Sequence, residues 1–327
     1  EIDFLFGMIE NLKKTGISII YITHRLDEVF RIADRVSVMR DGQMIQTFAV
    51  KDITVDELVA AMIGRKLESM YPSMKTEVGD VALEISEYSV RHPEYPTNIV
   101  DHVSMEFHFG EIVGISGLLG AGRTELMSAV VGAYKMRGKG VVKVKGNEKT
   151  FYSPSSAIKA GIGYVTEDRK NTGLILNQSI RFNTSLACLS KILKAGFLSP
   201  RKERTMVAEL ISRLKIKTES MENPASSLSG GNQQKVVLAK WIATGPSILI
   251  LDEPTRGVDV GARYEIYSIM KQLAAEGVCV IMISSDLPEV IGMSDRVYVM
   301  YEGKLQGELQ RSELSEDAIM RYAAGIV

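Results

Sequence analysis

The sequence predicts an α/β fold built on a parallel sheet, and three features support that prediction. Residues 248–251 and 278–283 are continuous apolar runs, which are typical of central strands covered on both faces. Short strands are also expected at residues 112–116 and 162–165, with helix-forming segments between them. A glycine-rich octapeptide at residues 117–124 joins strand 112–116 to a helix, which is the context that a phosphate-binding loop requires.

The octapeptide fits a phosphate-binding loop at every fixed position except one. Glycine has no Cβ atom, so the backbone can curl its N–H groups toward phosphate oxygens at the positive end of the following helix. Arginine stands where lysine is expected, and its planar guanidinium does not fit the space of a compact ammonium unchanged. The loop therefore predicts nucleotide binding but leaves catalysis open, and an ordinary glycine-rich turn is the alternative. The candidate residues are Gly117, Leu118, Leu119, Gly120, Ala121, Gly122 and Arg123, with Thr124 offering its hydroxyl to magnesium.

Composition limits the classes of protein that need to be considered. At 327 residues the chain is long enough for about two domains. Lys and Arg number 39 against 40 for Asp and Glu, so the charge gives no argument for a nucleic-acid partner. No apolar run approaches the roughly 20 residues that cross a bilayer, and the first residues lack the basic start of a signal peptide. Cys188 and Cys279 are expected to be buried. His92, His102 and His108 show no metal-ligand spacing and no partner acids in register, so they are expected to be solvated or satisfied histidines.

An internal repeat indicates how the chain is organised. Residues 16–42 match residues 277–303 without a gap, at a constant offset of 261 and with twelve identical positions. The second copy is preceded by nearly two hundred residues counted from about residue 81, and these include the phosphate-binding loop, but the first copy is preceded by only fifteen. We therefore expect two related units, of which the first is present only as its tail. On this interpretation the chain is a fragment cut inside the first of two tandem domains.

The tail of the first unit is expected to close an α/β domain. Residues 5–12 have helical spacing, and residues 17–22 and 36–39 are expected to form strands, the first of them buried. Residues 54–57 form a capping box that opens a helix, and Gly64 suits its end. The expected domains are residues 1–64 as the end of the first unit, residues 65–80 as a linker, and residues 81–327 as the second unit, with a helical insertion at about residues 174–228.

Two adjacent carboxylates follow the apolar run at residues 248–251. Asp252 and Glu253 come at the carboxyl end of a buried strand, where α/β proteins bind their ligands. In nucleoside triphosphatases the first acid holds the magnesium shell and the second polarises or deprotonates the attacking water. Asp252 is therefore predicted to serve the metal and Glu253 the catalysis, and an acidic helix start is the alternative.

A third motif lies between these two sites. Ser229, Gly230 and Gly231 open a clear helix, which makes an anion site, although a serine-capped helix is also possible. The order of phosphate-binding loop, Leu-Ser-Gly-Gly segment and Asp-Glu pair resembles the nucleotide-binding domains of ATP-binding cassette (ABC) transporters, over essentially the whole chain. The segments at residues 167–174, 230–235 and 252–262 are similar to the second half of monosaccharide importers, with ribose-type importers closest.

The resemblance implies a P-loop ATPase core with an antiparallel β region and a helical subdomain, and ATP with Mg²⁺ as ligands. It also implies a site shared by two domains, between one domain's phosphate-binding loop and the other's Ser229-Gly230-Gly231 segment. The family's catalytic histidine matches His24 in the first copy and is replaced by Ser285 in the second. The family's glutamine after strand 162–165 is absent. With Arg123, these departures indicate an impaired second site. An aromatic ring usually stacks on adenine, and Tyr95 is the candidate, with Tyr88 as its rival.

The resulting hypothesis is the energy-coupling subunit of a bacterial monosaccharide importer. Its expected partners are the missing first nucleotide-binding domain, integral membrane permease subunits and, through them, an extracytoplasmic sugar-binding protein. It would sit peripherally on the cytoplasmic face of the cell membrane and hydrolyse ATP mainly at the site that uses His24. Two alternatives are a soluble tandem ATPase of translation or repair, which would call for a long charged arm, and a nucleotide-sensing module without a transport partner. The transported sugar cannot be inferred, since other subunits recognise it.

Overall fold

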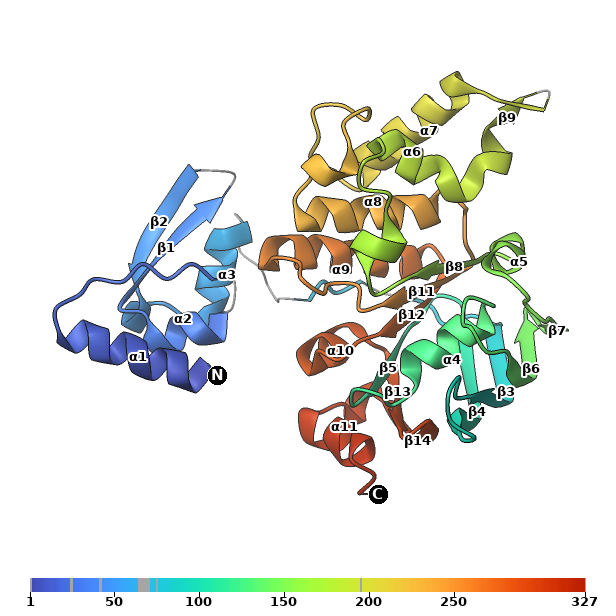
Figure 1. Cartoon of the computed structure of the whole chain (residues 1–327), viewed down its shortest axis with the longest axis horizontal. Coiled ribbons are helices and arrows are strands. Elements are labelled where there is room, and N and C mark those ends of the chain that lie inside the picture. Colours follow the sequence, from blue (N-terminus) through green and yellow to red (C-terminus); the bar gives the residue numbers. More distant parts are fainter. Residues whose placement is uncertain are drawn as a thin grey trace. The chain divides into compact units, whose positions relative to one another are not determined.

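The computed structural model describes residues 2–23, 26–40, 43–63, 71–74, 76–194 and 196–326. Contacts between residues divide the chain into two units (Figure 1). Unit 1 comprises Glu1–Met70 with Asp259–Gly261, and unit 2 comprises Tyr71–Val258 with Ala262–Val327. Each unit is described by itself. Within the described ranges, no helix has both the length and the apolar character needed to cross a membrane.

Unit 1 is a small α/β arrangement whose elements confirm most of the predictions for the tail. Its elements are α1 (Ile2–Lys14), α2 (Leu26–Ile32), β1 (Arg35–Arg40), β2 (Gln43–Ala49), η1 (Val50–Asp52) and α3 (Val55–Ile63). The capping box at the start of α3 is present, because the Glu57 N–H donates to Thr54 Oγ1 and the Thr54 N–H to Glu57 Oε2. Val29, Val38, Ile53 and Leu58 form the buried cluster that holds the unit together.

The buried strand predicted at residues 17–22 is not present. These residues have no regular structure, and Ile20 and Ile22 are 91% and 92% exposed. A strand needs a neighbour for its backbone groups, and among the described residues of unit 1 the strands β1 and β2 pair only with each other. A segment can therefore have the apolar composition of a strand and still not form one, because no neighbouring strand is available to pair with it.

Unit 2 is built on a six-stranded sheet in the order β14-β13-β5-β12-β11-β8. Five strands run parallel and β14 is antiparallel to β13, which confirms the α/β prediction. The bounds are β5 (Ile112–Gly117), β8 (Ile162–Val165), β11 (Ile248–Asp252), β12 (Cys279–Ile283), β13 (Arg296–Tyr301) and β14 (Lys304–Gln310). Every residue of β8, β11 and β12 is buried, which explains why these strands read as unbroken apolar runs.

A second, antiparallel sheet has the order β4-β3-β6-β7, as the resemblance implied. Its strands are β3 (Val81–Arg91), β4 (Asn98–His108), β6 (Gly138–Val144) and β7 (Asn147–Glu148). Helix α4 (Arg123–Val130) contacts β5 of the first sheet and β3, β4 and β6 of the second. The two sheets and α4 bury one apolar cluster that includes Phe107, Ile115, Leu126 and Met127.

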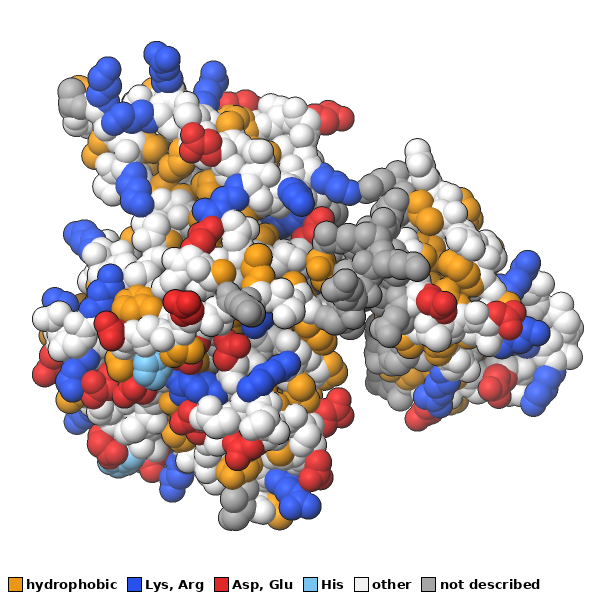
Figure 2. All heavy atoms as spheres, turned by 180° about the vertical axis from the view of Figure 1, so that it is seen from behind, with side chains coloured by type: hydrophobic (Ala, Val, Ile, Leu, Met, Phe, Trp, Pro, Cys, Tyr) orange, Lys and Arg blue, Asp and Glu red, His pale blue; other side chains and the backbone are white. Residues whose placement is uncertain are grey.

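The remaining helices cover the parallel sheet and form a helical region. They are α5 (Pro154–Lys159), α6 (Ile180–Ser185), α7 (Pro200–Arg213), α8 (Gly230–Ile242), α9 (Val260–Ala275), α10 (Leu287–Met293) and α11 (Glu316–Ala323), with the short turns η2 (Arg169–Gly173), η3 (Leu186–Ile192), η4 (Ala225–Ser227) and η5 (Arg311–Glu313). The small hairpin of β9 (Leu193–Lys194) and β10 (Phe197–Leu198) precedes α7. Ser199 caps α7 by accepting from the Lys202 N–H, as predicted. On the face seen in Figure 2, acidic and basic side chains are interspersed over the core of unit 2, and basic ones predominate at the end of the helical region.

The repeat found in the sequence recurs element by element. Helices α2 and α10, strands β1 and β13, turns η1 and η5, and helices α3 and α11 each begin 261 residues apart. Both hairpins carry a register shift at the equivalent step, between Val38 and Met39 in one and between Val299 and Met300 in the other. A shared irregularity of this kind supports a common origin for the two segments. The assignment of residues 1–64 to a first nucleotide-binding domain remains a prediction.

Candidate functional site

The glycine-rich loop connects the end of β5 to the first residue of α4. Gly117, Gly120 and Gly122 have φ angles of 152°, 80° and 90°. A Cβ atom on Gly117 would lie 2.4 Å from the Met300 carbonyl oxygen, and one on Gly122 would lie 2.7 Å from the Ile99 carbonyl oxygen. Only glycine fits these two positions, because the conformation and the close backbone contact both exclude a side chain. The loop is therefore shaped to present backbone N–H groups at the start of α4.

Asp252 ends β11 and lies completely buried beneath the loop. Its Oδ1 accepts a hydrogen bond from Thr124 Oγ1 at 3.1 Å, and its Oδ2 accepts one from Tyr164 Oη at 2.9 Å. Burial raises the pKa of Asp252 to about 6, although both hydrogen bonds lower it. A hydroxyl and a carboxylate side by side are hard oxygen ligands of the kind that Mg²⁺ prefers, with phosphate oxygens and water completing its shell. Thr124 and Asp252 therefore fit the metal role that the sequence predicted.

Glu253 adopts a left-handed backbone conformation with φ of 47°. Such a conformation is costly for a residue with a side chain and often marks a functional position. The Glu253 N–H donates to the Ile283 carbonyl at 2.8 Å, which fixes the residue against β12. Its carboxylate lies 4.0 Å from the Arg123 guanidinium and lines the same cavity as the glycine-rich loop.

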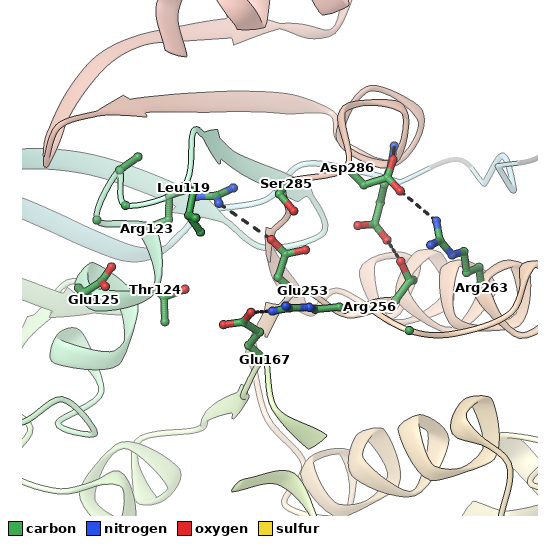
Figure 3. A pocket seen from close by; sticks show the side chains of 16 residues that line it. Leu119, Arg123, Thr124, Glu125, Glu167, Glu253, Arg256, Arg263, Ser285 and Asp286 are labelled. Carbon is green, nitrogen blue, oxygen red and sulfur yellow. Dashed lines mark hydrogen bonds and ion pairs between the residues drawn. The ribbon is translucent and has the colours of Figure 1, made fainter. Parts of the chain in front are cut away.

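A cavity of about 440 Å³ brings these segments together (Figure 3). Its wall carries the loop residues from Leu119 onward, and three arginines and five carboxylates supply its charge. Each arginine faces an acid: Arg123 faces Glu253, Arg256 pairs with Glu167, and Arg263 binds Asp286 at 2.9 Å. The charged residues of the lining are Arg123, Glu125, Glu167, Glu253, Arg256, Arg263, Asp286 and Glu289. An excess of carboxylates means that a polyphosphate would need a divalent cation to bind here.

Arg123 contacts the protein itself rather than projecting freely into the cavity. Its Nη1 donates to the Ser284 carbonyl at 2.7 Å, and the residue is only 8% exposed. The neighbouring Ser285 lines the cavity at the position where the repeat places His24 in unit 1. His24 lies outside the described residues. Glu167 lines the cavity just after β8, at the place where the sequence lacks the expected glutamine.

Ser229, Gly230 and Gly231 do not line this cavity. Ser229 precedes α8, but its hydroxyl does not cap the helix; it accepts a hydrogen bond from Asn232 Nδ2 at 3.0 Å. Ser229 therefore occupies the N-cap position of α8 without the side-chain hydrogen bond that a serine cap usually makes. The structure brings together the loop, the strand-end acids and Ser285, and it leaves the Ser-Gly-Gly segment for another role.

The two candidate adenine-stacking residues differ in exposure. Tyr88 is 6% exposed within the antiparallel sheet, and its ring fills the space beside Gly138. The prediction of Tyr88 as the rival adenine-stacking residue is therefore wrong. Tyr95 is 63% exposed, stacks against His92 at 4.6 Å between ring centroids, and does not line the cavity. An adenine contact of Tyr95 stays a prediction.

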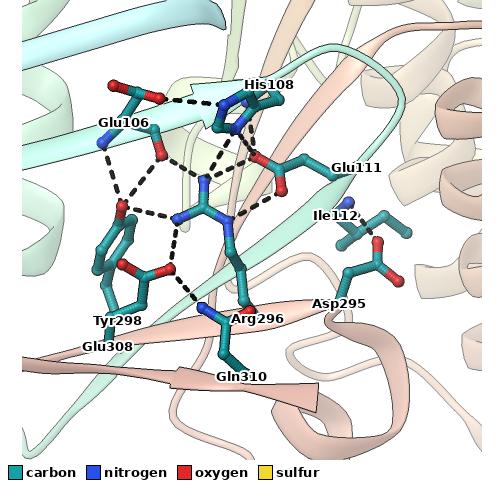
Figure 4. Close-up of polar contacts among 9 residues, drawn as sticks. All are labelled: Glu106, His108, Glu111, Ile112, Asp295, Arg296, Tyr298, Glu308 and Gln310. Carbon is teal, nitrogen blue, oxygen red and sulfur yellow. Dashed lines mark hydrogen bonds and ion pairs between the residues drawn. The ribbon is translucent and has the colours of Figure 1, made fainter. Parts of the chain in front are cut away.

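His102 and His108 have polar partners, in agreement with the expectation of satisfied histidines, and these partners are carboxylates. His102 Nδ1 lies 3.0 Å from Asp101, and His108 lies 3.2 Å from Glu111 and 3.0 Å from Glu106. Glu106 lies two residues before His108 on the same face of β4, Glu111 follows on the adjoining turn, and Asp101 is adjacent to His102. His108 belongs to a polar cluster around Arg296, which joins β13 to β4 (Figure 4). No group of three or more potential metal-ligating side chains occurs in the described part of the chain.

Tyr164 and Glu289 are site residues that the sequence did not reveal. Tyr164 sits inside an apolar run, and nothing in its neighbours indicates that its hydroxyl reaches Asp252. Glu289 is 1% exposed and accepts hydrogen bonds from Thr255, at 2.7 Å, and from Ser284. Its identity with Glu28 in the repeat was the one available signal.

Thr124 of the glycine-rich loop contacts Asp252 at the end of β11, and Glu253 follows directly. This arrangement is that of a P-loop nucleotide-binding protein. Residues 100–256 match the family model described as ABC transporter. The structure is similar to an ATP-binding cassette of an ABC transporter, with a TM-score of 0.64 and 21% identity over 76% of this chain and 98% of that one. At this identity the likeness shows the fold.

The curated relatives are more similar in sequence. The ribose import ATP-binding protein RbsA of Bacillus licheniformis is 49% identical over 99% of this chain, and that of Halalkalibacterium halodurans is 48% identical over the same share. The chain spans 64% of the length of each of these relatives.

Proposed function

We propose that the chain is part of the ATP-binding, energy-coupling component of a bacterial importer for a ribose-like or galactose-like monosaccharide. The observation that carries the proposal is the hydrogen bond from Thr124 to Asp252 beneath a loop in which Gly117 and Gly122 cannot be replaced by another residue. The relatives named for ribose import, at 49% and 48% identity, support the substrate class. ATP with Mg²⁺ is the ligand, Thr124 and Asp252 serve the metal, and Glu253 lies where the attacking water would be polarised.

The second site is adapted to hold nucleotide more than to hydrolyse it. Arg123, the residue in the lysine position, is engaged with the Ser284 carbonyl and faces Glu253 at 4.0 Å. Ser285 offers no imidazole to a terminal phosphate, and the stretch after β8, where the family has a glutamine, contributes the acidic Glu167 to the cavity wall. Since Ser229, Gly230 and Gly231 lie away from this cavity, they serve the other site, which is formed with the phosphate-binding loop of a first domain. Hydrolysis occurs mainly at that other site, which uses His24.

The partners follow from this division of roles. The subunit acts on integral membrane permease subunits, which in turn receive the sugar from an extracytoplasmic binding protein. It is peripheral and lies on the cytoplasmic face of the membrane. Co-purification with a polytopic membrane protein tests this arrangement, and its absence from a detergent-solubilised complex would favour a nucleotide-sensing module.

Nucleotide binding by this chain alone is the first test. Mg²⁺-ATP should bind weakly, and Thr124→Val should weaken binding in the presence of Mg²⁺ but little in EDTA, because the hydroxyl acts through the metal. Isothermal titration calorimetry measures both conditions. Turnover by the purified chain should be slow, and robust ATP hydrolysis that depends on Glu253 would overturn the assignment of an impaired site.

The Ser229 segment provides the second test, in a transporter that contains both domains. Replacing Ser229 with Arg should abolish sugar uptake into proteoliposomes, because the side chain would fill the space meant for the other domain's nucleotide. Glu253→Gln should reduce uptake much less. The division of roles fails if uptake survives Ser229→Arg while His24→Ala and Glu253→Gln stop it equally.

A further inference from the structure

Arg169 links two segments of unit 2. One is the turn at residues 256–257, which follows Asp252 and Glu253, and the other is η2, which leads into the helical region. Its Nη1 donates to the Arg256 carbonyl at 2.6 Å and its Nη2 to the Gly257 carbonyl at 3.1 Å. Arg169 itself opens η2, a π-helical turn four residues after β8. Short π-helical turns are rare and frequently occur at functional positions.

The same guanidinium lies against the start of α8. A Cβ atom on Gly230 would lie 2.9 Å from Arg169 Nη2 and 3.3 Å from the Gly257 carbonyl oxygen. Three segments that are far apart in the sequence therefore meet at one side chain: the start of η2, the turn at residues 256–257 and the Ser229-Gly230 segment. The absence of a side chain at Gly230 is what allows the close approach.

Each of these segments is held at a second point. Lys240 of α8 is 8% exposed and donates to the Gly173 carbonyl at 2.6 Å, which ties the other end of η2 to the same helix. On the opposite side of the turn, Arg263 Nε donates to the Val258 carbonyl at 3.2 Å and lines the nucleotide cavity. Three successive carbonyls, at residues 256–258, are thus fixed by two arginines.

Arg256 connects this arrangement to the cavity. Its carbonyl is held by Arg169, while its side chain pairs with Glu167 in the cavity wall. A movement of Arg256 toward a bound phosphate would therefore pull on the carbonyls that Arg169 holds. Because the same guanidinium contacts Gly230, that movement would reach the Ser229-Gly230-Gly231 segment.

We propose that Arg169 is a positioning residue that couples the nucleotide cavity of unit 2 to the start of α8. It sets where Ser229 and Gly230 lie relative to the turn at residues 256–258, without touching the nucleotide. The inference rests on the proposed function in one respect, namely that the Ser229 segment completes a site with another domain. The role requires arginine, because a planar fork with several donors reaches two carbonyls at once and a lysine ammonium on a flexible stem does not hold them in one geometry.

The experiment compares Arg169→Lys and Arg169→Gln with Lys170→Gln, which removes the same charge from the exposed neighbouring position. Amide hydrogen exchange in the peptides that cover residues 229–236 and 254–259 should accelerate by about tenfold or more in both Arg169 variants, since two charge-assisted hydrogen bonds are lost. Lys170→Gln should exchange as the wild type does. The melting temperature and the affinity for Mg²⁺-ATP should change little, because Arg169 contacts neither the main core nor the loop.

The functional arm uses the complete two-domain protein. There Arg169→Gln and Arg169→Lys should lower kcat for ATP hydrolysis at least about tenfold with little change in KM, and Lys170→Gln should not. Unchanged exchange at residues 229–236 in Arg169→Gln, or full rescue by Arg169→Lys, would overturn the coupling role. If wild-type chain binds no nucleotide while the exchange result holds, the proposed function fails and the positioning role stands.

Discussion

Replacing Asp252 with Asn should stabilise unit 2 at alkaline pH and not at acidic pH. Asp252 is fully buried, and burial raises its pKa from 3.8 to about 6 despite hydrogen bonds from Tyr164 and Thr124. The folded protein therefore binds this proton more tightly than the unfolded chain does. Between these two pKa values stability falls as the pH rises, because the charged carboxylate must be kept in a buried position.

The size of the effect follows from the shift. A difference of about 2 units, at about 1.4 kcal/mol for each unit, makes the charged form cost about 3 kcal/mol above pH 6, and nothing below pH 4. Asparagine removes that cost but has one acceptor oxygen instead of two, so a hydrogen bond worth about 1 kcal/mol is lost at every pH. Asp252→Asn should thus be about 1 kcal/mol less stable than wild type at pH 4, and about 2 kcal/mol more stable at pH 8.

The single tryptophan makes this measurable. Trp241 lies in α8 and packs against the main core of unit 2, so urea unfolding followed by its fluorescence reports on that unit. The titrations are run at pH 4 to 8 without Mg²⁺ or nucleotide, which would compete for the carboxylate. Asp317→Asn removes an acid whose side chain is 79% exposed and serves as control, with little change at any pH. The reasoning is refuted if the stability difference between wild type and Asp252→Asn is independent of pH, or if it grows toward acidic pH.

Two further changes probe the buried polar groups beside the site. Thr255→Val removes the donor at 2.7 Å from Glu289, so unfolding followed by Trp241 should show a loss of about 1–3 kcal/mol at pH 8. Burial raises the pKa of Glu289, so this loss should shrink as the pH falls and the carboxylate takes up its proton. Thr255→Ser keeps the hydroxyl and should behave as wild type. An equal loss of stability at pH 8 and at acidic pH would contradict the assignment. Arg296→Met leaves Glu111 buried without the guanidinium that binds both its oxygens at 2.9 and 2.7 Å (Figure 4), and should cost about 3–5 kcal/mol in the same assay. Adding Glu111→Gln should recover most of that stability, and no recovery would show that the charge of Glu111 is not the cause.

Local features of the site could be predicted from the sequence. The bounds of β8 were predicted to the residue, and those of β11 and β12 to within one, because a buried parallel strand has an apolar residue at nearly every position. The glycine-rich loop could be placed because its backbone conformation restricts the residue type directly. Asp252 and Thr124 could be paired because the end of a parallel strand and the start of the next helix share one edge of the sheet.

Contacts between distant segments could not be predicted in the same way. Arg169 and Gly257 are 88 residues apart, and no periodicity in either segment indicates that they meet. Tyr164 lies in the strand predicted at residues 162–165, but nothing in that segment indicates that its hydroxyl reaches Asp252. The run at residues 17–22 failed for a related reason: composition favours a strand, but only a neighbouring strand can satisfy the backbone.

Each copy of the repeat has a loop in which a hydroxyl residue donates to a buried glutamate, and the copies differ in the next residue of that loop. In unit 2, Ser284 donates to the buried Glu289, and in unit 1 the equivalent Thr23 donates to Glu28 at 2.8 Å. The glutamate and a hydroxyl at the donor position are thus retained in both. The next residue is Ser285 in one copy and His24 in the other. If the second site had simply decayed, the buried glutamate would be expected to be lost, since keeping a carboxylate out of water is costly even when hydroxyl groups donate to it. Its retention supports the proposal that the loop beside Arg123 still positions residues for nucleotide binding.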